Sequence, residues 1–369
     1  MTKKQIPMYT KIYEELRAKI NATAIDYDAP FCTEKSICEK YNVSRITAKR
    51  AIDDLEKDGF LYRKRGVGSF VRPPEESSKK YELHSPSVSG KPVALMIPFS
   101  ITRGGIFAAI QSASVILADA GLYLTLHVYT PGLENERKML SDLFANADGV
   151  IYYPSTDHIP VDILTEYYDN KKPVIIIDKP NDSPLFSSVV CDNFSGSYMV
   201  TSHVLAYGHK KTCYLSRYDY DNMCSIKDRY FGYKKAIEDF DGDITPRFVK
   251  IDIPKNESFN YPLLKHIVNT LHNEGITAII CENDEVAFYV HMAIRSLGLK
   301  PVDDMSITGF DNIEWATTAS ADITTVSQNF SEIGKGIAQI LLQDDYQPEH
   351  KVIPATLVPR TSTGPAPVG

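Results

Sequence analysis

The chain has 369 residues, more than one ordinary hydrophobic core supports, so its length predicts two or three domains. Its 43% hydrophobic and 24% charged residues are typical of a globular protein. The N-terminus lacks the apolar segment of a signal peptide, and no run approaches the ~18 apolar residues of a membrane span. We therefore expect a cytoplasmic protein with no membrane partner.

Charge and cysteine usage narrow the possibilities. Residues 1–72 hold 15 Lys+Arg against 10 Asp+Glu, a net of +5, which leaves 25 against 37, a net of −12, for residues 73–369. This split indicates that only the basic N-terminal part meets a polyanion. The six cysteines form no CxxC pair and have no histidine at zinc-finger spacing, so we expect reduced thiols, no metal site and no cofactor.

Residues 1–72 predict three helices followed by a β-hairpin. Apolar residues recur at helical spacing over residues 7–20, and a second, short helix begins at Thr33, the expected N-cap. A third helix runs from the cap Ser44 to Gly59, and its apolar stripe consists of Ala48, Ala51, Ile52 and Leu55. Two β-prone runs follow, with Arg63, Lys64 and Arg65 at the hairpin tip. These elements form an α+β winged helix-turn-helix domain.

The third helix carries Arg45, Lys49 and Arg50 off its apolar stripe. In a helix-turn-helix, the second helix of the pair lies in the major groove, and its N-terminal residues meet bases and phosphates. A solvated basic face is the ordinary alternative for an isolated helix. The short preceding helix, the turn at Asn42 and the basic hairpin favour DNA binding.

The segments "PMYTKIYEELRAKI" and "TEKSICEKYNVSRITAKRAIDDLEKDGFLYRKRGVGSFV" resemble the GntR-type DNA-binding domain over residues 7–71. The resemblance implies that one set of residues approaches DNA: Thr33, Lys35, Ser44, Arg45, Thr47, Lys49 and Gly66. The basic residues Arg50, Lys64 and Arg65 complete the predicted DNA-binding set.

A Pro- and Ser-rich stretch, residues 73–91, predicts a solvated linker, and residues 92–362 predict a second domain. Short apolar runs alternate there with helix-length segments, first "PVALMIPF", "LYLTLHVY", "DGVIYYP" and "PVIIID", then "KTCYLS", "TAIICE" and "MSITGF". Such runs fit parallel strands buried on both faces. The pattern predicts an α/β domain of two doubly wound lobes.

Ligands of such sheets bind beyond the carboxyl ends of the strands, in the crevice between lobes. The residues at these ends are Ser100, Thr102, Tyr152, Tyr153, Asp178, Asn283, Asp284 and Asp311. Neutral, carboxylate and aromatic groups suit a sugar, whereas a phosphorylated ligand would need more cations. Alternatives stay open: Asn283 or Asp284 caps the following helix, Asp178 and Asp311 order loops, Arg229 forms a surface ion pair, and Trp315 lies in the core.

The segments "SIKDRYFGYKKAI", "TAIICENDEVAFYVHMAIRSLGLKPVDDMSITGFDN" and "ADITTVSQNFSEIGKGIAQILL" resemble the LacI/GalR-type effector domain, a two-lobed periplasmic-binding-protein-like fold. The resemblance implies that Ser225 and Arg229 bind ligand hydroxyls, with Asn283 and Asp311 completing the polar set. It also implies that Asp178 and Gln328 line the near lobe. The predicted effector site is Ser100, Thr102, Tyr152, Asp178, Ser225, Arg229, Asn283, Asp311 and Gln328.

A GntR-type DNA-binding domain joined to a LacI/GalR-type effector domain resembles regulators of the arabinose-repressor type. They imply a homodimer that reads a palindromic operator in double-stranded DNA and is released by a free monosaccharide, with L-arabinose first and L-fucose or a similar sugar next. The alternative is a cytosolic sugar-binding protein, or a sugar-processing enzyme with an accessory DNA-binding part. No GxSxG, GxxxxGK[ST] or GxGxxG pattern occurs, so we expect no enzyme.

Overall fold

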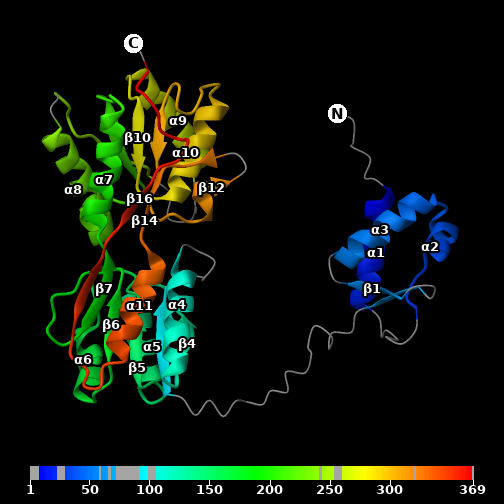
Figure 1. Cartoon of the computed structure of the whole chain (residues 1–369), viewed down its shortest axis with the longest axis horizontal. Coiled ribbons are helices and arrows are strands. Elements are labelled where there is room, and N and C mark those ends of the chain that lie inside the picture. The colour runs from blue at the N-terminus through cyan, green and yellow to red at the C-terminus, as the bar shows by residue number, and fades with distance from the viewer. Residues whose placement is uncertain are drawn as a thin grey trace. The chain divides into compact units, whose positions relative to one another are not determined.

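The computed structural model describes residues 8–22, 30–57, 60–64, 68–71, 91–98, 105–240, 243–252, 260–318 and 321–367. The chain divides into two compact units, residues 1–88 and 89–369 (Figure 1). The boundary falls within the predicted linker. Among the described residues, no helix combines the length and apolar character needed to cross a membrane.

The first unit, called the head below, contains three helices and a β-hairpin, as predicted. The helices are α1 (Met8–Ala22), α2 (Glu34–Tyr41) and α3 (Arg45–Lys57), and the antiparallel strands are β1 (Leu61–Lys64) and β2 (Gly68–Val71). The predicted stripe of α3 is buried, with Ala48, Ala51, Ile52 and Leu55 each at most 1% exposed. It packs on Ile12 and Leu16 of α1 and on Leu61 of β1.

The second unit begins with a lobe built on a six-stranded parallel sheet, called the first lobe. Its strand order is β15-β7-β6-β5-β3-β4. The strands are β3 (Lys91–Ile97), β4 (Leu122–Val128), β5 (Gly149–Tyr152), β6 (Val174–Ile177), β7 (Ser187–Cys191) and β15 (His350–Ile353). The helices are α4 (Ile106–Asp119), α5 (Leu133–Phe144), α6 (Val161–Asp169) and α11 (Phe330–Leu341).

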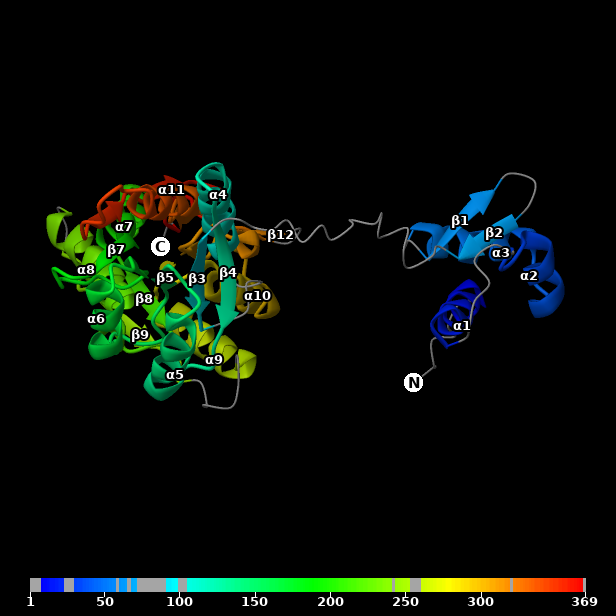
Figure 2. The same ribbon diagram turned by 90° about the horizontal axis from the view of Figure 1, so that it is seen from below.

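Alternating side chains of the first-lobe sheet supply two cores. In β6, Ile175 and Ile177 pack under α4 and α11, whereas Val174 and Ile176 pack under α5 and α6. Figure 2 shows α4 and α11 side by side over one face. The prediction of strands buried on both faces is wrong for β4, because β4 is an edge strand and its Leu126 and Val128 are 42% and 52% exposed.

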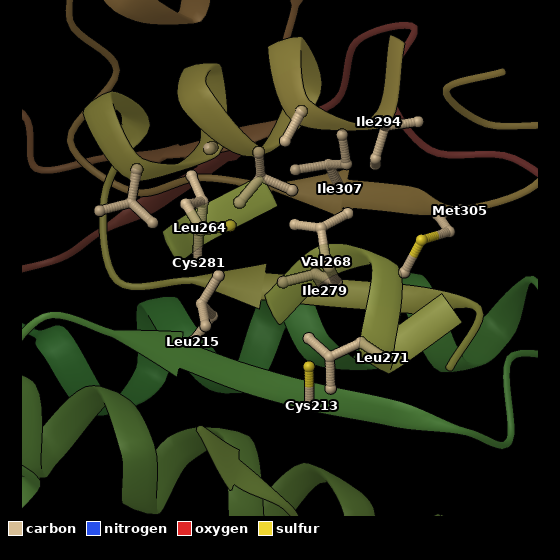
Figure 3. Close-up of a cluster of buried hydrophobic side chains, with 14 of the residues drawn as sticks. Cys213, Leu215, Leu264, Val268, Leu271, Ile279, Cys281, Ile294, Met305 and Ile307 are labelled. Carbon is tan, nitrogen blue, oxygen red and sulfur yellow. The ribbon is translucent and has the colours of Figure 1, made fainter. Parts of the chain in front are cut away.

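The second lobe has a four-stranded parallel sheet in the order β11-β10-β8-β9. Its strands are β8 (Thr212–Ser216), β9 (Phe248–Lys250), β10 (Ala278–Cys281) and β11 (Ser306–Thr308). Helices α7 (Asn193–Ala206) and α8 (Cys224–Asp239) cover one face, and α9 (Tyr261–Asn273) and α10 (Asp284–Ser296) cover the other. Figure 3 shows the core under α9 and α10, where Leu264, Val268 and Ile294 meet Ile279 of β10.

The chain crosses between the lobes at three places. It leaves the first lobe between β7 and α7, returns between β14 (Thr325–Ser327) and α11, and leaves again between β15 and β16 (Thr356–Val358). Strands β14 and β16 pair antiparallel beside each other. A small hairpin of β12 (Thr317–Thr318) and β13 (Ala321–Asp322) completes the strands.

The second unit extends beyond residue 362, the predicted end of the domain. Thr363 is 8% exposed, and the Gly364 carbonyl accepts a hydrogen bond from the buried His209 ring at 3.0 Å. The Ala366 amide donates to the Tyr207 carbonyl at 2.9 Å. Residues 363–366 are therefore part of the folded second lobe.

Candidate functional site

The turn between α2 and α3 is held by local polar contacts. Thr33 and Ser36 cap α2 reciprocally, and Asn42 ends it at φ 49°, a left-handed conformation that asparagine tolerates. Ser44 Oγ accepts the Thr47 amide at 3.3 Å and lies 2.9 Å from the Thr47 hydroxyl. The predicted caps are confirmed: Thr33 caps the start of α2, and Ser44 caps the start of α3 just after the turn at Asn42.

The outer surface of this turn is basic and exposed. Arg45 and Lys35 are 84% and 86% exposed in their side chains, Lys49 is exposed, and Ile46 is 82% exposed although it is apolar. Arg45 Nε lies 2.7 Å from Glu34 Oε2, which orients its guanidinium at the start of α3. An exposed isoleucine between two cations matches an element that meets thymine methyls and phosphates.

The remaining predicted DNA-binding residues have mixed placements. Arg50 lies over the Tyr9 ring of α1, 3.9 Å from its centroid, so part of its surface is used inside the head. Lys64 is in β1 rather than at a tip, and Arg65 and Gly66 lie outside the described residues. Arg63, expected at the tip, is also in β1 and pairs with Asp53 and Glu56 of α3, Nε lying 3.2 Å from Glu56 Oε2.

A cleft between the lobes of the second unit forms the second candidate site. Its inner pocket, of about 110 Å³, is lined by Gly105, Ile106, Tyr153, Ile177, Asp178, Cys191, Asp311, Gln328, Phe330 and Ile333. A wider outer pocket of about 440 Å³ shares Gly105, Asp311 and Phe330 with it. The inner pocket has a polar side of carboxylate, amide and phenol groups and an apolar side around Phe330.

Arg229 of α8 organises the polar side from the second lobe. It is 6% exposed, and its guanidinium donates to Asn193 Oδ1 at 2.8 Å, to the Glu282 carbonyl at 2.6 Å and to Asp311 Oδ1 at 3.2 Å. Its guanidinium carbon lies 3.8 Å from the centroid of the Phe310 ring. The alternative of a surface ion pair is wrong, since Arg229 itself is buried and its contacts to Asn193 and Glu282 are buried as well.

Asp178 and Asp311 face the inner pocket from opposite lobes, and each has a cationic partner. Asp311 accepts from Gln328 Nε2 at 2.6 Å as well as from Arg229, and Lys179 Nζ lies 3.2 Å from Asp178 Oδ2. Burial raises the pKa of Asp311, and Arg229 opposes that rise. Both carboxylates sit at positive φ, 70° for Asp178 and 110° for Asp311, strained backbone of a kind that clusters at binding sites.

Tyr152 does not contact the pocket. It is fully buried in the core under α5 and α6, where its hydroxyl donates to Glu136, also fully buried. The aromatic residue of the pocket is its neighbour Tyr153, whose pKa is raised by burial and by the nearby Asp178. Successive strand residues point to opposite faces, which explains why adjacent tyrosines lie on different sides of the sheet.

The other predicted effector residues serve the second lobe or lie outside the description. Asn283 Oδ1 accepts the Val286 amide at 2.9 Å and caps α10, and Ser225 is buried in the first turn of α8. Asp284 is fully buried, accepts the Ile313 amide at 2.9 Å, and has its pKa raised by burial to about 8. Ser100 and Thr102 fall outside the described residues. Trp315 packs against Phe288 and Tyr289 near the core of the second lobe.

Sequence reasoning missed Asn193, Cys191 and Phe330. Asn193 and Cys191 lie at the carboxyl end of β7, a strand that "SSVVC" did not suggest because two of its five residues are serines. The rule that ligands bind beyond strand ends would have found them had the strand been predicted. Phe330 opens α11 just after a crossing between lobes, a position that only the tertiary structure reveals.

Each of the two units of the structure matches a known protein family. Residues 8–71 match the family of bacterial regulatory proteins, gntR family, and residues 201–363 match the periplasmic binding protein-like domain. An arabinose metabolism transcriptional repressor of Geobacillus stearothermophilus is 25% identical over 93% of this chain and 92% of its own. The HTH-type transcriptional regulator RegA of Clostridium saccharobutylicum is 27% identical over 84% and 90%, respectively.

A crystal structure of a LacI family transcriptional regulator from Enterococcus faecium with bound ribose is similar to the second unit. It has a TM-score of 0.62 and 23% identity, and the match covers 74% of this chain and 99% of that one. This similarity establishes the two-lobed periplasmic-binding-protein-like fold of the second unit.

Proposed function

Because the chain joins a gntR-family DNA-binding domain to a periplasmic-binding-protein-like domain, we propose that it is a transcriptional repressor released from its operator by a free monosaccharide. The inner pocket carries this proposal. Its carboxylates Asp178 and Asp311 are balanced by Lys179 and Arg229, so the lining suits an uncharged ligand with many hydroxyls. The Phe330 ring offers an apolar surface to the face of a sugar ring. The names of the relatives favour L-arabinose first, with L-fucose or a similar sugar next.

The head supplies the operator contact. We assign the base-reading role to Arg45 and Ile46, and phosphate contact to Lys35 and Lys49, because these side chains are exposed at one end of α3 and along α2. We assign the protein to the cytoplasm, where a bacterial regulator has access to DNA. The relatives are named as regulators, and this favours a binding protein over an enzyme.

Reading a palindrome requires a two-fold dimer, and the second unit is the larger part that would supply its interface. We assign this role to the apolar surface of α4 and β4, where Phe107, Val115, Leu126 and Val128 are between 42% and 65% exposed. The two elements contact each other, and β4 has an unpaired edge in the described sheet.

A thermal-shift screen of the full chain against free monosaccharides tests the proposal. A sugar at 100 times its dissociation constant stabilises the protein by roughly 2.7 kcal/mol. The sugar that raises the melting temperature is then added to an operator complex followed by fluorescence anisotropy, and we expect the complex to dissociate. Stabilisation without any change in operator affinity would contradict the repressor assignment, and consumption of the sugar would favour an enzyme.

A further inference from the structure

A direct polar contact joins the lobes beside the inner pocket. Asp157, in the loop after β5 of the first lobe, accepts the backbone amide of Cys224 with Oδ2 at 3.0 Å. Cys224 is the first residue of α8, the helix that carries Ser225 and Arg229. A carboxylate of the first lobe therefore accepts a hydrogen bond from the start of α8, the second-lobe helix whose Arg229 pairs with the pocket residue Asp311.

The start of α8 needs such an acceptor. The first amides of a helix have no intrahelical partner, and the N-cap Met223 offers no side-chain hydrogen bond. The first turn of α8 contains no acidic residue either. Asp157 thus supplies both the missing acceptor and a negative charge at the positive end of the helix dipole.

Lys179 connects this contact to the pocket. Its side chain is 4% exposed, and its Nζ lies 3.7 Å from Asp157 Oδ1 and 3.2 Å from Asp178 Oδ2. Within the described structure, Nζ has no hydrogen-bond partner with suitable geometry, so the two carboxylates compensate its charge as ion pairs. The contacts run from the pocket residue Asp178, through Lys179 and Asp157, to the start of α8.

We propose that Asp157 and Lys179 are positioning residues of the effector site, which hold the first lobe against α8 and set how firmly the cleft closes on a bound ligand. Separating the lobes breaks the contact between Asp157 and Cys224, whereas the pairs of Lys179 remain inside the first lobe. The inference rests on the proposed effector role of the cleft.

Hydrogen–deuterium exchange of the full chain without any sugar tests the contact itself. Asp157→Ala should raise the exchange rate of the Cys224 amide about fivefold or more, because the amide loses its charged acceptor. Asp157→Asn keeps an acceptor oxygen and should give an intermediate rate. Asp162→Ala is the matched control, because this first-lobe aspartate pairs with Arg137 of the same lobe. Unchanged exchange at Cys224 in Asp157→Ala, or an equal rise across the whole first lobe, overturns the proposal.

Calorimetry with L-arabinose as the probe tests the consequence. Asp157→Ala should weaken L-arabinose binding about tenfold, and Asp157→Asn less, while the Asp162→Ala control keeps wild-type affinity. Wild-type affinity in Asp157→Ala contradicts the positioning role even if exchange at Cys224 rises. Absence of L-arabinose binding to the wild type counts against the sugar assignment alone, and the exchange experiment then decides on the contact.

Discussion

Arg229→Ala should destabilise the second unit strongly. The substitution removes the donors to Asn193, to the Glu282 carbonyl and to Asp311, and leaves the Asp311 carboxylate without its buried cation. Removing one partner of a buried ion pair costs about 3–5 kcal/mol. A unit of this size loses about 2–4 °C per kcal/mol, so the expected fall in melting temperature is about 6–20 °C.

Calorimetric melting of the full chain measures the effect, and the head serves as an internal reference because it lies in a separate compact unit. The double variant Arg229→Ala/Asp311→Asn should recover part of the loss, because the amide leaves no uncompensated charge. A loss smaller than about 1 kcal/mol, or no recovery in the double variant, would refute the argument that this pair carries the polar side of the pocket.

The loss should also depend on pH with a definite sign. Burial already raises the pKa of Asp311, and without Arg229 the pKa rises further. A carboxyl whose pKa is higher in the folded than in the unfolded state stabilises the protein at low pH. This contribution is lost as the pH rises through the folded-state pKa. The difference in the free energy of unfolding between the variant and the wild type is therefore largest near neutral pH. It narrows as the pH falls towards the ordinary pKa of aspartate.

Three further predictions test other parts of the chain. Arg45→Ala should weaken operator binding by about 1–3 kcal/mol and reduce base discrimination at one position of the operator. Lys49→Ala should weaken binding to all DNA sequences alike and reduce the salt dependence of the affinity. Anisotropy titrations at several salt concentrations measure both effects. The pKa of Asp284 is raised to about 8 by burial, so its contribution to stability is lost as the pH rises through about 8, and Asp284→Asn should flatten this decline in chemical denaturation. Val115→Arg should convert the expected dimer to a monomer in light scattering while the circular dichroism spectrum of the folded chain stays unchanged, because Val115 is 65% exposed.

The sequence predicted the strongly apolar or amphipathic elements well and the strands without such a pattern poorly. The stripe of α3 and the apolar runs of β3, β5, β6, β8 and β10 were recognisable because a single physical cause, burial, determines each of their residues. Strands β14, β15 and β16 have three or four residues and form only because distant segments pair with them. Such pairing leaves no local pattern.

The same distinction holds for the site. Strand ends and family motifs mark Asp178, Asp311, Gln328 and Arg229; in the structure the first three line the inner pocket, and Arg229 pairs with Asp311 behind it. Tyr152 failed because a shift of one residue along a strand exchanges its two faces, and a strand end is not known to one residue from sequence. The position of Arg50 over the Tyr9 ring depends on how α1 packs against α3. The residue pattern of α3 alone does not contain this information.

The three crossings between the lobes also govern the order in which the parts become available during translation. The first-lobe sheet lacks its edge strand β15, and one face lacks α11, until the ribosome has made the whole second-lobe sheet. The head, by contrast, is synthesised first, and the residues of its described core all lie between residues 9 and 71. A chain that terminates early, anywhere between α7 and α11, therefore contains the whole sequence of the head but lacks at least Phe330 and Ile333 of the pocket lining. Under the proposed function, a nonsense mutation in this region would yield a fragment whose single head contacts DNA without the dimer partner and without a response to the inducer.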